Sequence, residues 1–302
     1  MNESFLSILV DPTTDSPLQL NEAKTHLFSL GTNQTFHIEG NVPVILINKL
    51  ATTNDLTSEH EKSDSGFNYQ AHYQKDAEFF DYNNLDESPA TTHELRRLQE
   101  AILNRITLND KLLLDVGCGK GWVANLCLPI NKQVISMDIS TVNPIKALAN
   151  YPNHNHFGLV ADVYHLPIKN NSINCIIAAE IMEHVPDPKR FVATLYNKLK
   201  PNGKLLITTP YNEKLTYNLC VHCNRATPQN AHLHSFNETN IKALIPEGAV
   251  YKWDKFMNKY LAKLRSHIVL KYLPFVAWKL IDKAFDKLFP KPMRLLIEIQ
   301  KR

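Results

Sequence analysis

Short apolar runs separated by amphipathic stretches organise the chain from residue 112 onwards. Strands that are buried on both faces of a parallel sheet have this nearly continuous apolar character. Between the runs lie segments with helical periodicity, such as residues 187–199, which a Lys-Pro-Asn-Gly turn follows. The alternation predicts an α/β fold with a doubly wound, mostly parallel sheet. The expected strands are residues 112–116, 134–138, 158–162, 173–180, 204–210 and, last and antiparallel, 293–299.

The first apolar run ends in a stretch with three glycines, residues 117–121. Glycines leave backbone N–H groups uncovered and let a ligand approach the main chain closely. The dinucleotide-binding fingerprint requires a glycine where Trp122 stands, and a P-loop requires Ser or Thr where Gly121 stands. Asp115 at the strand end would repel a pyrophosphate but suits a cofactor with an ammonium group. The turn therefore favours S-adenosylmethionine, with a tight turn that binds no ligand as the alternative.

Four stretches of the chain closely resemble class I S-adenosylmethionine-dependent methyltransferases. They read LLLDVGCGKGWVA, VISMDIS, LVADVYHLPIKNNSINCIIAAEIMEHV and LYNKLKPNGKLLITTP, and the resemblance runs from about residue 95 to residue 302. It implies a Rossmann-like, seven-stranded sheet. It also implies that Asp115, Gly117 and Gly119 hold the methionine part, Asp138 the ribose hydroxyls, and Asp162 with Val163 the adenine. The full expected cofactor set is Asp115, Gly117, Cys118, Gly119, Asp138, Ile139, Asp162, Val163, Glu180 and Tyr73.

A second candidate centre, Glu-Ile-Met-Glu-His, follows the fourth expected strand. If a helix begins there, Glu180, Glu183 and His184 share one face. The segment resembles one that many small-molecule methyltransferases carry without a metal. It is also similar to that of the small-RNA terminal 2′-O-methyltransferases, which hold a divalent cation with a later histidine, here His232. We expect these four residues to be catalytic, with His184 or His232 as general base and a metal ion as the alternative.

A third pattern, Cys220-x-x-Cys223 followed by His232-x-His234, has a spacing that is typical of zinc ligands. It predicts a structural Cys₂His₂ zinc site, with zinc as a second cofactor. The alternative is a reduced thiol pair on a substrate loop. Because His232 cannot readily serve both a zinc ion and the catalytic centre, the two hypotheses compete.

The first 55 residues predict a small β-rich module. It weakly resembles the zinc-ribbon proteins that activate methyltransferases, but Asp11-Pro12-Thr13-Thr14 stands where that family has Cys-Pro-x-Cys. A metal-free docking or folding module is expected, with an unrelated β-rich cap as the alternative. Residues 56–94 are expected to form a linker and a lid segment, in which Tyr69 and Tyr73 lie four apart on one helical face. Residues 95–302 would form the methyltransferase domain, with a helical insertion at about 251–290.

Charge is distributed unevenly around the overall net charge of +3. Residues 1–90 hold four lysines and no arginine against fourteen acidic residues, whereas residues 251–302 hold thirteen basic and four acidic residues. Two amphipathic helical patterns, over residues 253–268 and 278–288, lie in the basic segment. We expect their apolar stripes to face the core and their lysines to be solvated. Contact with RNA phosphates or with an anionic membrane is the alternative.

Five cysteines without a regular framework indicate a reducing, cytoplasmic environment. No apolar run is long enough to span a membrane, and no signal-peptide pattern is present. The sequence therefore predicts a cytoplasmic enzyme that methylates oxygen or nitrogen on a small-molecule or lipid-linked acceptor. Two alternatives are metal-assisted methylation of the RNA ribose 2′-oxygen and a non-catalytic, cofactor-binding partner subunit of another methyltransferase.

Overall fold

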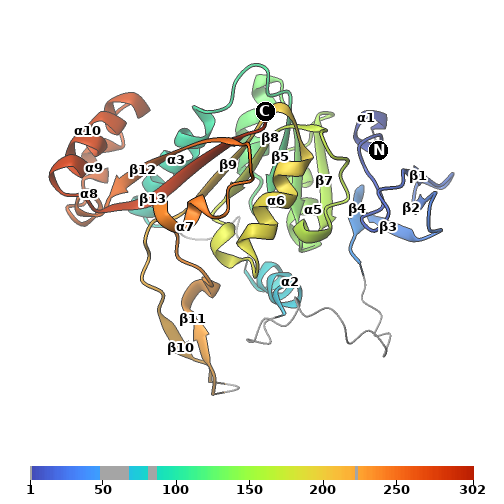
Figure 1. The fold of residues 1–302 in the computed structure, drawn as a ribbon, viewed down its shortest axis with the longest axis horizontal. Helices are drawn as coiled ribbons and strands as arrows, with labels where there is room; N and C mark the ends of the chain where they lie inside the picture. The colour runs from blue at the N-terminus through green and yellow to red at the C-terminus, as the bar shows by residue number, and fades with distance from the viewer. Residues whose placement is uncertain (1, 48–67, 81–86, 222–223) are drawn as a thin grey trace. The chain divides into compact units, whose positions relative to one another are not determined.

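The computed structural model describes residues 2–47, 68–80, 87–221 and 224–302 (Figure 1). Two compact units make up the chain. Unit 1 comprises Met1–Asn83 and Lys111–Ile173, and unit 2 comprises Asn84–Asp110 and Asn174–Arg302. Within the described residues, no helix is both long enough and apolar enough to cross a membrane.

Unit 1 is built on a sheet with the strand order β1-β2-β3-β4-β7-β6-β5. The strands β4, β7, β6 and β5 pair in parallel, and β1 to β4 pair with one another in antiparallel order. The N-terminal strands therefore continue the parallel sheet through the β4–β7 pair. The bounds are β1 (Leu18–Leu20), β2 (His26–Ser29), β3 (Thr35–Glu39), β4 (Val42–Ile45), β5 (Leu112–Val116), β6 (Gln133–Asp138) and β7 (His156–Ala161).

The junction of β4 and β7 depends on a glycine. A Cβ atom on Gly158 would lie 2.7 Å from a methyl carbon of Val42, so only glycine allows β4 to approach β7 this closely. Val42, Val44 and Val160 form a buried cluster at this junction. The helical segments of unit 1 are α1 (Glu3–Leu6), α2 (Tyr69–Phe79), α4 (Trp122–Cys127), η2 (Leu128–Ile130), α5 (Val142–Asn150) and η3 (Val163–His165).

A buried carboxylate, Asp11, organises the N-terminal turn. Asp11 is fully buried and accepts hydrogen bonds from Thr13 N (2.8 Å) and from the hydroxyls of Thr13 (2.6 Å) and Thr32 (2.7 Å). Burial alone would raise the pKa of Asp11, but these bonds and one from Ser29 lower it to about 2. An Asx-type turn thus orders this segment. The predicted kinship to zinc-ribbon activators, like the predicted domain boundaries, stays a prediction.

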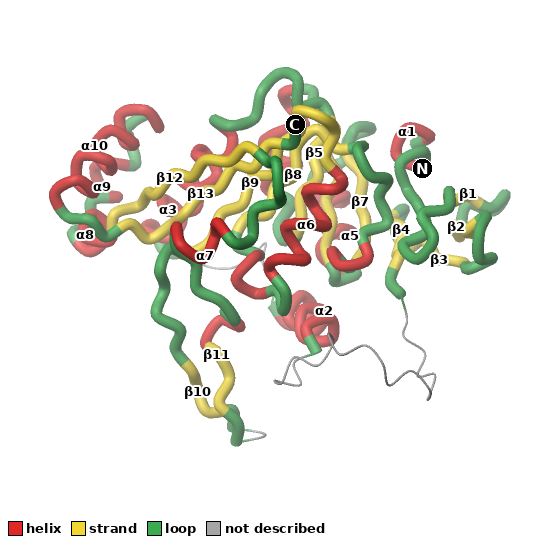
Figure 2. The backbone as a smooth tube through the Cα atoms, in the orientation of Figure 1, coloured by secondary structure: helices red, strands yellow, loops and turns green. Residues whose placement is uncertain are grey.

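Unit 2 contains the long strand β9, to which β13 pairs, and β12 pairs to β13, all in antiparallel order. A separate hairpin, β10–β11, extends away from these three strands (Figure 2). The strands of unit 2 are β8 (Ile173–Ala179), β9 (Leu199–Pro210), β10 (Tyr217–Leu219), β11 (Ala226–Pro228), β12 (Val250–Asn258) and β13 (Pro292–Gln300). Its helices are α3 (Pro89–Leu103), η4 (Met182–His184), α6 (Pro188–Lys198), η5 (Gln229–Ala231), α7 (Glu238–Lys242), α8 (Lys259–Lys263), α9 (His267–Leu270) and α10 (Phe275–Leu288).

One predicted helix was wrong. Residues 253–258, expected to begin an amphipathic helix, belong to strand β12, where Trp253 pairs with Ile297 and Phe256 with Arg294 of β13. The apolar residues of the strand end and of the short helix α8 together imitate helical spacing. Pairing with β13 outweighs that local pattern, as tertiary context commonly does.

Candidate functional site

Three aspartates of unit 1 stand at the carboxyl ends of three neighbouring parallel strands. Asp115 lies in β5, Asp138 ends β6, and Asp162 follows β7. Their side chains are buried, with 1%, 8% and 2% of the residue surface exposed. The carboxyl edge of an open α/β sheet is where such folds bind ligands. The structure therefore gathers the predicted cofactor carboxylates at one edge.

Asp115 has no hydrogen-bond partner for its Oδ2 atom among the described residues, although that atom is buried. Burial, together with the nearby charge of Asp138, raises the pKa of Asp115 to about 8. Buried polar atoms in proteins are nearly always paired, so this oxygen is a candidate contact for a ligand or a water molecule. A positively charged donor such as an ammonium group would satisfy this oxygen and favour its ionised form.

The two ends of the glycine turn serve different purposes. Gly117, Gly119 and Gly121 all adopt positive φ angles, 69°, 46° and 73°. A Cβ atom on Gly119 would meet no atom of the described residues within 4 Å, so the backbone there is open to close approach. A Cβ atom on Gly121 would lie 3.0 Å from the Cβ of Ala147 on helix α5. Gly119 therefore suits close approach of a ligand, and Gly121 suits packing of the turn on its own unit.

Asp138 is held by donors from three directions. It accepts from Ser140 N (3.0 Å), from Asn143 Nδ2 (3.0 Å) and, at the limit of hydrogen bonding, from Gly119 N (3.5 Å). Burial nevertheless raises its pKa. A carboxylate oriented in this way can accept hydrogen bonds from the two hydroxyls of a ribose.

The other predicted neighbours of this edge are mostly apolar contacts. Ile139 is half-buried, and Val163 is 8% exposed. Burial raises the pKa of the Cys118 thiol well above its usual range. Cys118 therefore contributes backbone and shape to the turn, and its thiol is a poor nucleophile.

Helix α2 is anchored to the ends of β6 and β7. Asp162 accepts hydrogen bonds from Tyr69 Oη (2.5 Å), Gln70 Nε2 (2.9 Å) and Tyr164 N (3.0 Å). Gln74 adds a bond at the next turn of the helix, since its Oε1 accepts from Thr141 N at 2.9 Å. Burial acts to raise the pKa of Asp162, but these bonds and the one from His165 lower it on balance.

Of the two predicted lid tyrosines, Tyr69 thus reaches Asp162, the carboxylate predicted to bind adenine, while Tyr73 is half-buried and packs edge-on against His72. Sequence reasoning missed Gln70 and Gln74. Their signal was present, because residues 69, 70, 73 and 74 fall on one side of a helix.

In unit 2, Glu180 leaves strand β8 in a left-handed conformation with φ 57°. The condition that a helix begins at this residue is therefore not met, and a short 3₁₀ turn follows at Met182–His184. Glu180 instead forms an ion pair with Arg294 of β13, with 2.8 Å between Oε2 and Nε. Burial raises the pKa of Glu180 despite that partner.

The remaining predicted catalytic residues do come together. Glu183, His184 and His232 offer ligand atoms that all lie within 4.8 Å of one another. The two imidazole rings meet edge-on, with centroids 4.8 Å apart. The backbone oxygen of Glu183 accepts from Leu233 N (2.8 Å) and His234 N (3.2 Å), which fastens the histidine segment to the 3₁₀ turn.

Glu213 orients His232, a contact that the sequence did not suggest. The Nδ1 atom of His232 lies 2.6 Å from Oε2 of Glu213. A carboxylate at Nδ1 favours the tautomer that leaves Nε2 as the basic nitrogen. Burial and the neighbouring Glu180 raise the pKa of the Glu183 carboxyl well above its usual range. It accepts from the Thr209 hydroxyl at 3.0 Å.

The predicted zinc ligands are not assembled in the described part of the chain. Cys220 lies in the β10–β11 hairpin and forms no metal-binding group with His232 and His234. The ring of His234 bonds the backbone oxygen of Val185 at 2.9 Å, and His232 bonds Glu213. Cys223 lies outside the described residues, so the four-ligand zinc site stays a prediction.

Unit 2 also contains a cavity near the first residues of β13. His93 is 9% exposed at this cavity, and its Nδ1 has no hydrogen-bond partner among the described residues. Burial and the charge of Arg97 lower the pKa of His93 to about 4, so the imidazole is neutral at pH 7. The lining residues are Ala90, His93, Glu94, Met257, Asn258, Leu261, Ala262, Ser266, His267, Trp278, Asp282 and Met293.

Comparison with known proteins identifies relatives of the central part of the chain. A family model described as a methyltransferase domain matches residues 91–247, slightly more than half of the chain. A probable S-adenosylmethionine-dependent methyltransferase of Mycolicibacterium smegmatis is 27% identical over 135 residues, which cover 44% of this chain and 49% of that protein. A ubiquinone biosynthesis O-methyltransferase of Coxiella burnetii is 31% identical over 111 residues, 36% of this chain and 47% of that protein. The chain spans about half the length of the curated relatives that it matches.

A solved structure shows the same fold. The crystal structure of an S-adenosylmethionine-dependent methyltransferase from Mesorhizobium loti matches with a TM-score of 0.50 and 17% identity. The match covers 69% of this chain and all of that one. The predicted Rossmann-like α/β fold class is confirmed.

Proposed function

The chain belongs to the methyltransferase-domain family, and on that premise we propose that it transfers a methyl group from S-adenosylmethionine to oxygen or nitrogen of a small-molecule or lipid-linked acceptor. One observation carries the proposal. Among the described residues, the buried Oδ2 of Asp115 has no hydrogen-bond partner, and no atom lies within 4 Å of the place that a Cβ of Gly119 would take in the turn beside it. A zwitterionic amino-acid group fits such a place, whereas a pyrophosphate does not.

The residues of unit 1 fit the parts of this cofactor. Asp115 would accept from the ammonium group, and the backbone at Gly119 allows the methionine part to lie close. Asp138 would accept from the ribose hydroxyls, and Asp162 from the adenine amine, with Val163 against the ring. When bound, the cofactor supplies an electrophilic methyl group on a sulfonium sulfur. Helix α2, tied to Asp162 through Tyr69, would exclude water from the adenine end.

In unit 2, His232 is the general base of the proposal. A hydroxyl acceptor must lose its proton as it attacks carbon, and His232 Nε2 would take that proton. Glu213 at Nδ1 would hold the ring and stabilise the imidazolium that forms. The Glu183 carboxyl, whose pKa burial and Glu180 raise, lies beside His232, and the ion pair with Arg294 balances the charge of Glu180. Most of the remaining rate enhancement would come from holding the acceptor in line with the methyl group.

The cavity of unit 2 that His93 lines is the proposed place for the body of the acceptor. Its walls include apolar side chains of Leu261, Trp278 and Met293, and the neutral His93 offers a nitrogen for one hydrogen bond. An apolar body with one polar group would match it. The O-methyltransferase names of several relatives support oxygen as the acceptor atom.

Calorimetric titration of the purified chain tests the proposal. S-adenosylmethionine and S-adenosylhomocysteine are expected to bind, while NAD and ATP should not. Transfer of a labelled methyl group is then measured with metabolite, lipid and RNA pools as acceptors. Absence of S-adenosylmethionine binding would overturn the enzyme proposal. Binding without transfer to any pool would favour a non-catalytic partner subunit.

Metal-assisted methylation of an RNA ribose is a second candidate, favoured by the close grouping of Glu183, His184 and His232. A divalent ion there would polarise the ribose hydroxyls. Under this candidate, Mn²⁺ or Co²⁺ binds stoichiometrically by elemental analysis and His184→Ala abolishes the binding. Methyl transfer to RNA would then require the metal. Full activity in EDTA would eliminate this candidate and leave His232 as the base.

A further inference from the structure

The segment of unit 2 from α8 to α10 presents large apolar side chains to solvent. A protein surface normally exposes such residues singly. Here they recur along one short stretch of chain, and most are more than half exposed. The set, which we call the apolar face, is Leu264 (69%), Ile268 (56%), Val269 (69%), Tyr272 (79%), Val276 (67%) and Leu280 (65%).

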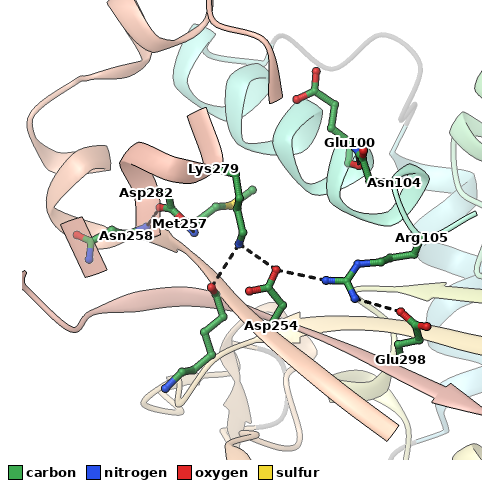
Figure 3. Close-up of polar contacts among 10 residues, drawn as sticks. Glu100, Asn104, Arg105, Asp254, Met257, Asn258, Lys279, Asp282 and Glu298 are labelled. Carbon is green, nitrogen blue, oxygen red and sulfur yellow. Dashed lines mark hydrogen bonds and ion pairs between the residues drawn. The ribbon is translucent and has the colours of Figure 1, made fainter. Parts of the chain in front are cut away.

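Helix α10 is oriented by polar contacts on its inner side (Figure 3). Lys279 forms an ion pair with Asp254 of β12 at 3.1 Å, and buried Asp282 accepts from Met257 N (3.0 Å) and Asn258 N (2.8 Å). A soluble helix normally turns its apolar stripe inward and its polar side outward. In α10, the polar side chains of Lys279 and Asp282 face the protein, while Val276 and Leu280 face solvent. This arrangement is expected of a surface that meets another apolar phase.

Exposed basic residues alternate with the apolar face along the chain. Lys263 and Arg265 flank Leu264, Lys271 precedes Tyr272, and Lys283 stands one helical turn after Leu280; all four cations are exposed. Burial and the ion pair remove Lys279 from this surface charge. Apolar side chains that enter the lipid boundary, ringed by cations that reach phosphate groups, are the pattern of an interfacial membrane segment.

We propose that the apolar face docks this protein on the surface of an anionic phospholipid bilayer. Charge complementarity selects this occupant. A second copy of the chain would bring the same cations against one another across a two-fold interface, and a nucleic acid would not require exposed valine and isoleucine. The proposal does not depend on methyl transfer and concerns where the chain works.

The test is flotation of the full chain with vesicles of phosphatidylcholine alone and of phosphatidylcholine with 30% phosphatidylglycerol. The protein is expected to bind the anionic vesicles, and this binding is expected to weaken as the salt concentration is raised. The variant Val269→Ser/Val276→Ser/Leu280→Ser should lower the partition coefficient at least about tenfold. Replacing Lys263, Lys271 and Lys283 by Gln should lower it about 100-fold, since each cation contributes about fivefold.

Matched controls replace exposed residues elsewhere. They are Leu30→Ser/Leu108→Ser/Ile130→Ser for the apolar variant and Lys24→Gln/Lys111→Gln/Lys189→Gln for the charge variant. Both controls should bind vesicles like the wild type. Hydrogen exchange of the unmodified protein is an independent readout, with protection of residues 264–281 expected on anionic vesicles.

Three results would overturn the proposal. The first is that wild-type protein fails to float with anionic vesicles. The second is that the control variants lose as much binding as the face variants. The third is that light scattering shows a dimer for the wild-type protein and a monomer for the Val269/Val276/Leu280 variant, because a second copy would then cover the apolar face. Circular dichroism and the Tm of each variant show whether it is folded without reference to the cofactor, which separates a failure here from a failure of the methyl-transfer proposal.

Discussion

In unit 1, three aspartates end three adjacent parallel strands, whereas in unit 2 the histidine cluster joins segments about 50 residues apart along the chain. The aspartates need only their own strands to reach one edge of the sheet. The histidines need a docked loop, which the backbone of Glu183 holds through Leu233 and His234. The comparison shows that a binding edge can follow from local strand order, while a proton-transfer centre depends on tertiary contacts. The two regions should therefore fail differently when they are altered.

The largest effect is expected in the histidine cluster. His232→Ala should lower kcat about 10²- to 10⁴-fold, because general-base catalysis contributes on that order. The dissociation constant for S-adenosylmethionine should stay unchanged. The measurement is methyl transfer at saturating cofactor beside a calorimetric titration, with exposed His154→Ala as control. Wild-type turnover in His232→Ala would remove this residue from the proposed chemistry.

At the sheet edge of unit 1, a substitution is expected to weaken cofactor binding directly. Asp115→Asn should weaken S-adenosylmethionine binding about 100-fold, since it removes the charge that would pair with a buried ammonium group. Asp15→Asn, at an exposed turn, is the matched control and should bind normally. Calorimetry measures both. Unchanged affinity in Asp115→Asn would mean that this carboxylate does not contact the cofactor.

Proton release on cofactor binding gives a second test of Asp115 that does not involve the histidine cluster. With a pKa of about 8, Asp115 holds a proton at pH 7 and must lose it to pair with an ammonium group. Affinity should therefore rise about tenfold per pH unit between pH 6 and 8 and level off above that. Titrations at pH 7 in buffers of different ionisation enthalpy should show nearly one proton released. Asp115→Asn should release none, and equal release from both proteins would contradict the assignment.

The raised pKa of Asp115 also makes the stability of the folded chain depend on pH. Stability should fall as pH rises, whereas affinity for the cofactor should increase. Because the folded-state pKa of Asp115 lies above the unfolded value near 3.8, the folded chain binds this proton more tightly. The resulting stabilisation is complete below about pH 4 and is lost as pH rises to about 8. The Tm of cofactor-free protein should fall over that range more steeply than the Tm of Asp115→Asn.

The smallest effect is expected at helix α2. Tyr69→Phe removes one hydrogen bond to Asp162, and a bond to a charged group is worth about 1.5–3 kcal/mol. Amide hydrogens of residues 69–79 should exchange faster, while those of β6 and β7 should not change. Tyr217→Phe, an exposed tyrosine of unit 2, serves as control. Unaltered exchange in α2 would show that the helix is held by other contacts.

Much of unit 1 could be derived from local patterns. Apolar runs, a glycine turn and an acidic residue at each strand end are short-range features, and parallel pairing then brings Asp115, Asp138 and Asp162 to one edge. The residues that complete this edge were less visible. Gln70 and Gln74 matter because α2 lies against Asp162 and Thr141, and no local pattern states where a helix docks.

Unit 2 shows where local patterns mislead. The spacing that predicted a helix over residues 253–268 combined the end of β12 with α8, because a strand end followed by a short helix imitates the helical period. The stripe expected to face the core in α10 contributes Trp278, but Ile281 and Leu288 are exposed. Lys279 and Asp282 face inward because Asp254 and two backbone amides supply partners for them.

By itself, the sequence determined the strand–helix alternation, the glycine turn and the identity of the three carboxylates, since each depends on residues adjacent in the chain. Tertiary structure alone decided that Asp115 keeps an oxygen without a partner among the described residues, that Glu213 orients His232, and that Glu180 meets Arg294. It also decided which side of α10 meets solvent. These outcomes depend on which distant groups share a buried space, where pairing and desolvation fix both pKa and orientation.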